Sequence, residues 1–297
     1  MKPWSLVSYR TRGGQERAGA LYEQKVVELP IVACGVLELI ERWADVEPAL
    51  RKFDPASAPQ VEDARLELPL RYPRKVLCSG ANYHAHMREM KVDRPAEARP
   101  YFFLKPPTTA LVGPGEPIVV PTDPGAKVDW EAELAVVIGI GGRDIPAADA
   151  LAHVAGYCVA NDITARGRHR RSAVPAEAFT YDWFAAKSMD SSLPLGPGIT
   201  PAFQVPDPQD LRLRLWVNGE LQQDESTSDM VCPVAELISA ASEVVTLEPG
   251  DVIATGTPSG VGAARGLYLR AGDVVRVAID GLGILENTVI DPAGGTS

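Results

Sequence analysis

Short apolar or alternating runs, bounded by glycine, proline, asparagine or aspartate, follow one another along most of the chain. Runs of this length and pattern predict β-strands. In the first part of the chain they cover residues 4–10 and 18–30. The later runs cover residues 116–121, 133–140, 155–162, 211–223, 250–256, 273–280 and 283–290. The sequence therefore predicts a protein in which β-strands dominate.

Turns and helices agree with this prediction. Asn218 and Gly219 divide the run 211–223, and this dipeptide is typical of a tight β-hairpin. Apolar periodicity predicts only occasional helices, near residues 35–46, 145–154 and 233–242. So few helices disfavour a doubly wound parallel sheet, which needs one between most strands. We expect a mixed α/β fold, rich in strands, with a β-roll core.

A change of pattern near residue 70 predicts a domain boundary. Residues 66–75 carry two prolines and lead into a new apolar run, residues 75–83. Proline-rich segments between patterned regions mark loops and boundaries. We therefore expect a small N-terminal domain over residues 1–70 and a larger domain over residues 71–297.

Composition and charge narrow the choice of partners. The chain has 297 residues, 45% of them hydrophobic, and a formal net charge of −10. This charge argues against nucleic acid or an anionic membrane as the main partner. No apolar stretch is long enough to span a bilayer. The four cysteines are scattered, which indicates buried, reduced thiols in a cytoplasmic protein.

Acidic residues stand at the start of one predicted strand and at the end of another. Asp129, Glu131 and Glu133 occupy alternate positions, so in a strand their side chains share one face. Asp162 ends the apolar run 155–162. Carboxylates at the mouths of buried strands need a cation, and oxygen ligands favour Mg²⁺, Mn²⁺ or Ca²⁺. The spacing alone leaves both a metal site and a solvated strand edge open.

Two further side chains are candidates for catalysis. His86 and Glu89 are three residues apart and would share one face of a helix. A carboxylate orients an imidazole and raises its basicity, which suits a general base acting on water, although an ordinary surface pair has the same spacing. Lys187 has apolar neighbours, so it either polarises a carbonyl or extends to solvent.

A basic segment, residues 166–171, follows Asp162 and includes Arg166 and Arg170. As a site it would attract a carboxylate; the alternative is a solvated loop in an acidic protein. Residues 254–262 combine glycine, threonine and serine, and their amides and Thr257 can bind a carboxylate. We predict a small-molecule carboxylate substrate whose second carboxylate contacts Arg170.

Seven motifs follow one another along the chain: GANYHAHMREM, FLKPPTTALVGPGEPIVVP, VDWEAELAVVIG, AGYCVANDITAR, AAKSMDSSLPLGP, VNGELQQDESTSDM and LEPGDVIATGTPSGVG. In this order they resemble the fumarylacetoacetate hydrolase family, in its branch of acylpyruvases and 2-hydroxyhepta-2,4-diene-1,7-dioate isomerases. The resemblance covers roughly residues 75–290 and implies that family's catalytic β-roll, usually dimeric, preceded by a small N-terminal domain.

The resemblance also implies roles for individual residues. The family's metal ligands fall on Glu131, Glu133 and Asp162, whereas Asp129 matches no ligand. Its His–Glu dyad falls on His86 and Glu89, and its catalytic lysine on Lys187. Substrate contacts are implied for three residues: Tyr83, Arg166 and Thr257.

These residues together predict a metal-dependent hydrolase, using Mg²⁺ or Mn²⁺, that cleaves a carbon–carbon bond of an acylpyruvate-type 2,4-dioxo acid. His86 would deprotonate water and Lys187 would stabilise the oxyanion. Isomerisation of a 2-hydroxy-dienedioate and decarboxylation of a 2-oxo acid are the alternatives within the same chemistry. A non-catalytic relative that binds a metal or ligand is the alternative of another class.

Overall fold

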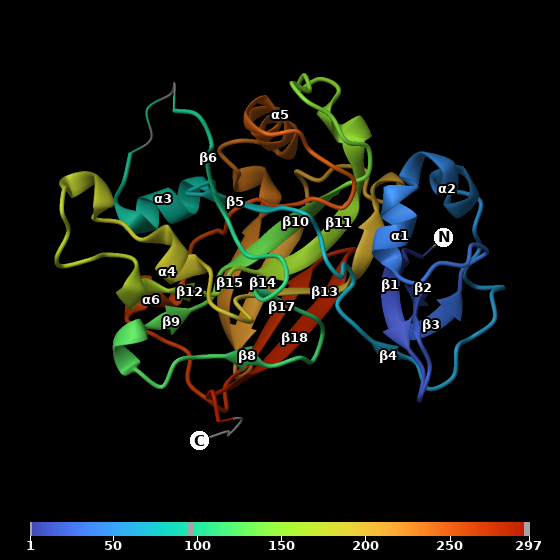
Figure 1. The fold of residues 1–297 in the computed structure, drawn as a ribbon, viewed down its shortest axis with the longest axis horizontal. Coiled ribbons are helices and arrows are strands. Elements are labelled where there is room, and N and C mark those ends of the chain that lie inside the picture. Colours follow the sequence, from blue (N-terminus) through green and yellow to red (C-terminus); the bar gives the residue numbers. More distant parts are fainter. Residues whose placement is uncertain (1, 94, 96–97, 294–297) are drawn as a thin grey trace.

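The computed structural model describes residues 2–93, 95 and 98–293, and most of its strands belong to two large sheets (Figure 1). The larger sheet has the order β3-β2-β1-β13-β11-β10-β16-β5-β6, with β4 paired to β1 and β7 to β13. Its strands are β1 Ser5–Arg10, β2 Glu16–Tyr22, β3 Lys25–Glu28, β4 Arg65–Leu66, β5 Val76–Gly80, β6 Tyr101–Leu104, β7 Leu111–Val112, β10 Ala132–Ile138, β11 Val154–Asn161, β13 Leu193–Pro201 and β16 Val252–Ala254.

The second sheet has five strands in the order β15-β14-β17-β18-β8, and β9 and β12 form a separate short ribbon. The β14–β15 hairpin turns at Asn218 and Gly219, both with positive φ, as predicted from the Asn-Gly pair. These strands are β8 Ile118–Val119, β9 Val128–Asp129, β12 Thr164–Ala165, β14 Arg212–Val217, β15 Glu220–Ser226, β17 Val274–Ile279 and β18 Gly283–Ile290. The mixed, strand-rich fold predicted from the sequence is confirmed.

The described residues form six α-helices. They are α1 Val36–Glu41, α2 Trp43–Leu50, α3 His84–Met90, α4 Trp183–Lys187, α5 Val234–Val244 and α6 Gly262–Arg265. The single helix predicted over residues 35–46 is two helices, because Arg42 between them has a non-helical backbone (φ −114°, ψ 26°). The helix predicted over residues 145–154 was wrong, since only a 3₁₀ turn forms at Ala150–His153. The helix predicted near residues 233–242 is confirmed as α5.

The N-terminal segment is joined to the rest of the protein through the larger sheet. Its strand β1 pairs antiparallel with β13, with Leu6 opposite Ile199. Figure 1 shows β1–β4, α1 and α2 together on one side, and α3, α4 and the β9–β12 ribbon on the other. The boundary at residue 70 stays a prediction.

Strand β10 lies between the two main hydrophobic cores. Leu134 and Val136 pack into one core, and Ala135 and Val137 pack into the other. Because both faces of β10 are buried, its sequence is a continuous apolar run rather than an alternating one. Side chains at the start of β10 therefore lie in the interior of the protein.

Within the described residues, no helix is long and apolar enough to cross a membrane. The cysteines agree with the sequence-based expectation of buried thiols in three of four cases. Cys78, Cys158 and Cys232 are buried, and Cys34 is exposed. Cytoplasmic location and a homodimer stay predictions.

Candidate active site

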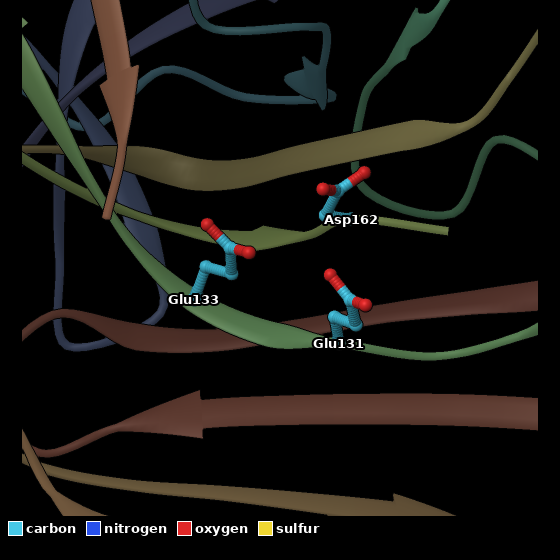
Figure 2. A group of neighbouring side chains, drawn as sticks. All are labelled: Glu131, Glu133 and Asp162. Carbon is cyan, nitrogen blue, oxygen red and sulfur yellow. The ribbon is translucent and has the colours of Figure 1, made fainter. Parts of the chain in front are cut away.

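Three carboxylates converge where β10 begins and β11 ends. Glu131 directly precedes β10, Glu133 lies in it, and Asp162 directly follows β11. The antiparallel register pairs Ala132 with Asn161, so the start of one strand lies beside the end of the other. One oxygen from each carboxylate lies within 4.8 Å of the others, and Figure 2 shows the three groups facing one another. All three residues are buried, which excludes the solvated strand edge.

Basic side chains surround this triad. The Lys187 Nζ, at the end of α4, donates to Glu131 Oε2 and Asp162 Oδ2, both at 2.7 Å. Lys105 pairs with the other oxygen of Asp162 and donates to the Ile163 carbonyl at 3.2 Å. Arg166 pairs with Glu131 Oε1. The triad is therefore a buried, charged network in which most carboxylate oxygens have a cationic partner.

Asp129 lies outside the triad. Its Oδ1 accepts from Arg166 Nε at 2.8 Å, and its Oδ2 accepts from the Ala263 N–H at 2.8 Å. Burial raises its pKa to about 6, and the neighbouring Glu131 carboxylate also raises it, against the lowering effect of Arg166. Asp129 thus fixes Arg166 in place, in keeping with the expectation that it is not a ligand.

The charge balance at Glu133 tests whether a metal fits this site. Burial would raise the pKa of Glu131, but Lys187 and Arg166 outweigh burial and lower it to about 2. Burial together with Asp162 and Glu131 raises the pKa of Glu133 well above its usual value. Among the described residues, only the Gly256 N–H donates to Glu133, at 2.8 Å.

A bound divalent cation would supply the positive charge that Glu133 lacks. Three buried carboxylates offer only oxygen ligands, which hard cations prefer. The site therefore fits Mg²⁺ or Mn²⁺, with Glu131, Glu133 and Asp162 as ligands. That ligand set stays a prediction.

The predicted His–Glu pair forms in the first turns of α3. His86 Nδ1 lies 3.0 Å from Glu89 Oε2, and the Glu89 Oε1 accepts from the Gly260 N–H at 2.9 Å. Burial would raise the pKa of Glu89, but these two hydrogen bonds lower it below its usual value. The His86 side chain is only 6% exposed, so the pair is not a solvated surface pair. An ionised Glu89 only accepts, so the Nδ1 carries the proton and the Nε2 is left as the base.

A cavity of about 440 Å³ opens onto the triad. The predicted site residues that line it are His86, Glu131, Arg166, Lys187 and Thr257. Glu89, Glu133 and Asp162 do not line it, but Glu89 contacts His86 and Asp162 contacts Lys187. Its other lining residues are Ser79, Gly80, Ala81, Met90, Val92, Tyr101, Phe103, Thr164, His169, Tyr181, Trp183 and Ala186.

Two predicted substrate contacts do not line the cavity. Tyr83 is fully buried in the hydrophobic core at the start of α3, and its hydroxyl lacks a hydrogen-bond partner among the described residues. Arg170 is exposed, and its backbone pairs with that of Tyr181. The structure therefore places neither side chain against a substrate in this cavity.

Lys105 and Gln223 belong to the site but were not predicted from the sequence. The Lys105 side chain is fully buried against Asp162, although nothing in its motif, a lysine before two prolines, distinguishes it from a surface residue. Gln223 donates to Thr257 Oγ1 at 2.9 Å and accepts from the Ala132 N–H at 2.9 Å. It thus ties the cavity wall to the start of β10, a contact that sequence spacing cannot reveal.

The chain is similar to several known enzymes. A mitochondrial oxaloacetate tautomerase of Bos taurus is 43% identical over 228 residues, which are 75% of this chain and 68% of the relative. The maleylpyruvate hydrolase of Sphingobium sp. SYK-6, solved with manganese(II) and pyruvate, is 32% identical with a TM-score of 0.76, covering 96% of this chain and 99% of that chain. The 5-carboxymethyl-2-hydroxymuconate delta-isomerase of Mycobacterium smegmatis is 32% identical with a TM-score of 0.75, covering 97% and 98%.

The family model for the C-terminal domain of fumarylacetoacetate hydrolase matches residues 75–290. This range contains the triad, the His–Glu pair and every residue that lines the cavity. Members of the family include hydrolases, isomerases and tautomerases. The chain belongs to the fumarylacetoacetate hydrolase family.

Proposed function

We propose that this chain is a metal-dependent hydrolase that cleaves the bond between C3 and C4 of an acylpyruvate-type 2,4-dioxo acid. One observation carries the proposal. A buried base, His86 with Glu89, and a buried ammonium, Lys187, line the same cavity beside a carboxylate triad that fits a divalent cation. That combination provides both a water-activating group and a site for a 2-oxo acid.

The metal's part is electrostatic. A bound Mg²⁺ or Mn²⁺, held by Glu131, Glu133 and Asp162, would act as a Lewis acid on the carboxylate and 2-oxo group of the substrate. Thr257 lines the cavity, and its hydroxyl can contact the substrate carboxylate there.

The protein's own groups would perform the proton transfers. His86 takes a proton from water through its Nε2, while Glu89 holds the ring in the required tautomer. Oxygen of that water bonds to C4, and Lys187 donates a hydrogen bond to the oxyanion. The pKa of Lys187 is raised, because Asp162 and Glu131 outweigh burial, so it remains a donor. The C3–C4 bond then breaks, C3 takes up a proton, and the products are pyruvate and a carboxylic acid.

A second candidate is keto–enol tautomerisation of oxaloacetate or isomerisation of a dienedioate. The specific observation in its favour is the 43% identity to an oxaloacetate tautomerase. In that reaction His86 would move a proton at C3, and no water would add. The same residues serve both reactions, so an assay must separate them.

The proposal is tested by supplying acylpyruvates, oxaloacetate and 2-hydroxy-dienedioates in the presence of Mg²⁺ or Mn²⁺. Hydrolysis predicts pyruvate plus a second acid, with ¹⁸O from labelled water in that acid. Turnover of oxaloacetate or dienedioates without any acylpyruvate cleavage would replace the hydrolase by the second candidate. No turnover of any of them with metal bound would indicate a non-catalytic relative.

A further inference from the structure

We propose that the part of the cavity lined by aromatic rings is a subsite for a planar, apolar acyl tail, so that the preferred substrate is an aryl- or alkenyl-substituted monoacid. This inference rests on the proposed function and names its substrate class. We call the subsite the aromatic wall and define it by its five rings: Tyr101, Phe103, His169, Tyr181 and Trp183.

The rings of the aromatic wall contact one another in a continuous row. The Trp183 ring stacks on Phe103 with centroids 5.2 Å apart and an interplanar angle of 26°. Tyr101 and His169 lie 5.0 Å and 4.4 Å from the Trp183 ring centroid, and Tyr181 lies 5.2 Å from His169. Aromatic faces in such rows favour a further stacked or edge-on ring.

The aromatic wall begins at the catalytic lysine. The Lys187 Nζ lies 5.1 Å from the centroid of the Phe103 ring. Trp183 and Lys187 are the first and last residues of α4, so they lie four apart on one face of that helix. A substrate whose C4 oxygen contacts Lys187 would therefore extend its acyl tail along Phe103 and Trp183.

Backbone hydrogen bonds hold the wall's outer part in place. The chain doubles back after residue 166, so that the Arg171 N–H donates to the Thr180 carbonyl at 2.9 Å and the Asp182 N–H donates to the His169 carbonyl at 2.8 Å. The Asp182 side chain then caps α4 by accepting from the Ala185 N–H at 2.9 Å. The rings are thus positioned before a substrate arrives, which lowers the entropic cost of binding.

Charge argues against a second substrate carboxylate at this end. Among the described residues that line the cavity, only Arg166 and Lys187 are lysine or arginine, and both are engaged by buried carboxylates. Burial lowers the pKa of His169, and Arg166 and Lys187 lower it further, so its ring is neutral. Arg170 is exposed and outside the lining. A carboxylate tail would therefore find no free cation among the residues that line this end of the cavity.

The volume of the cavity also favours a substrate with a longer acyl tail. A cavity of about 440 Å³ lies in the range that encloses drug-sized ligands, whereas oxaloacetate has only four carbons. The pyruvate moiety at the triad would leave the aromatic wall uncovered unless the acyl tail is long enough to reach it.

The test compares three tails on one head group: benzoylpyruvate, fumarylpyruvate and acetylpyruvate. We expect kcat/KM for benzoylpyruvate to be about 10-fold higher than for fumarylpyruvate or acetylpyruvate. A 10-fold ratio corresponds to one favourable aromatic contact. The same comparison is made by competitive inhibition with acids that cannot be cleaved: 2-oxo-4-phenylbutanoate, 2-oxoheptanedioate and 2-oxopentanoate. A preference for fumarylpyruvate and 2-oxoheptanedioate would overturn the inference and leave the proposed function standing.

Variants localise the effect. Trp183→Ala should lower the ratio of kcat/KM for benzoylpyruvate to kcat/KM for acetylpyruvate about 10-fold. Trp183→Phe should retain most of the wild-type ratio. Tyr181→Ala removes a ring that is 57% exposed and serves as a second variant if Trp183→Ala does not fold. Phe184→Ala, on the same helix but 75% exposed and outside the lining, is the matched control and should change nothing.

The outcomes separate the two proposals. If no acylpyruvate is cleaved, the proposed hydrolysis fails, and the inhibition constants of the uncleavable acids still decide the tail subsite. If Trp183→Ala lowers the rate equally for all tails, the ring only supports Lys187, and the aromatic wall is not a substrate subsite.

Discussion

Replacing Glu89 by glutamine tests whether this carboxylate sets the tautomer of His86. In the wild-type protein both Glu89 oxygens accept hydrogen bonds, one from the Gly260 N–H at 2.9 Å and one from the His86 Nδ1 at 3.0 Å. A glutamine has one acceptor oxygen and one donor NH₂ group, so it cannot serve both partners.

The structure indicates which partner a glutamine would keep. Turning the amide oxygen away from Gly260 leaves that partly buried N–H unsatisfied, at a cost of about 1–3 kcal/mol, or roughly 5- to 150-fold in population. The oxygen therefore stays with Gly260, and the NH₂ group donates to His86 Nδ1. The Nε2 then carries the ring proton and cannot take one from water. The corresponding loss of tautomer in a serine protease lowers kcat about 10⁴-fold.

We therefore expect Glu89→Gln to lower kcat/KM by about 5- to 150-fold, the fraction of the amide that still accepts from His86, and His86→Ala to lower it by about 10²–10⁴-fold. The assay is acylpyruvate cleavage at saturating Mg²⁺ or Mn²⁺, with metal affinity measured separately by calorimetry and expected to be unchanged. Added imidazole should rescue His86→Ala but not Glu89→Gln, in which the ring still fills its position. Glu47→Gln, which removes a surface carboxylate paired with Arg51, is the control. Activity of Glu89→Gln within a few-fold of wild type would refute the reasoning.

Four further outcomes follow from the site and its surroundings. Exhaustive chelation with EDTA should abolish activity and Mg²⁺ or Mn²⁺ should restore it; full activity of metal-free protein, checked by elemental analysis, contradicts the metal requirement. Glu133→Gln should weaken metal binding at least about 10-fold in calorimetry, because it removes a charged ligand, whereas Asp129→Asn should keep most of the affinity; the reverse result would show that the ligands are misassigned. Lys105→Met should lower the free energy of unfolding by about 3–5 kcal/mol, since it leaves a buried carboxylate without one of its partners. Arg276→Met, at an exposed pair with Glu286, should cost about 1 kcal/mol or less; equal losses in urea titrations would contradict this. Because the pKa of Glu89 is lower in the folded than in the unfolded protein, Glu89 stabilises the fold at any pH above its unfolded-state pKa. This stability is lost as the pH falls through the folded-state pKa, so Glu89→Gln should make the free energy of unfolding depend less on pH at acidic pH than in the wild type. Parallel plots of stability against pH would contradict the assignment.

The sequence predicted those parts of the fold that depend on local pattern. Strands β10 and β11 are runs of apolar residues, and their acidic ends could be recognised because a long apolar run predicts burial. The hairpin at Asn218 needs only two residues with positive φ, which Asn-Gly supplies. The helix predicted at residues 145–154 failed because a periodic pattern over ten residues does not ensure helical packing, and only a short turn forms.

The rest of the site depends on contacts between segments far apart in the chain. Lys105 reaches Asp162 across 57 residues, and Gln223 reaches Ala132 across 91. Neither contact leaves a local pattern, so no periodicity or spacing could predict it. The basic segment, residues 166–171, is the opposite case. Its charge is evident from the sequence, but only the tertiary structure shows that Arg166 faces the triad while Arg170 faces solvent.

The pairing of β1 with β13 has a consequence for engineering the protein. Strand β13 is buried along all nine of its residues, with β11 on one side and β1 on the other. Cutting the chain near residue 70 would strip β1 away and leave a bare, apolar strand edge. Exposed edges of this kind recruit strands from other molecules. A shortened form that keeps every catalytic residue is therefore expected to aggregate, and charged substitutions along β13 would be needed to keep it monodisperse.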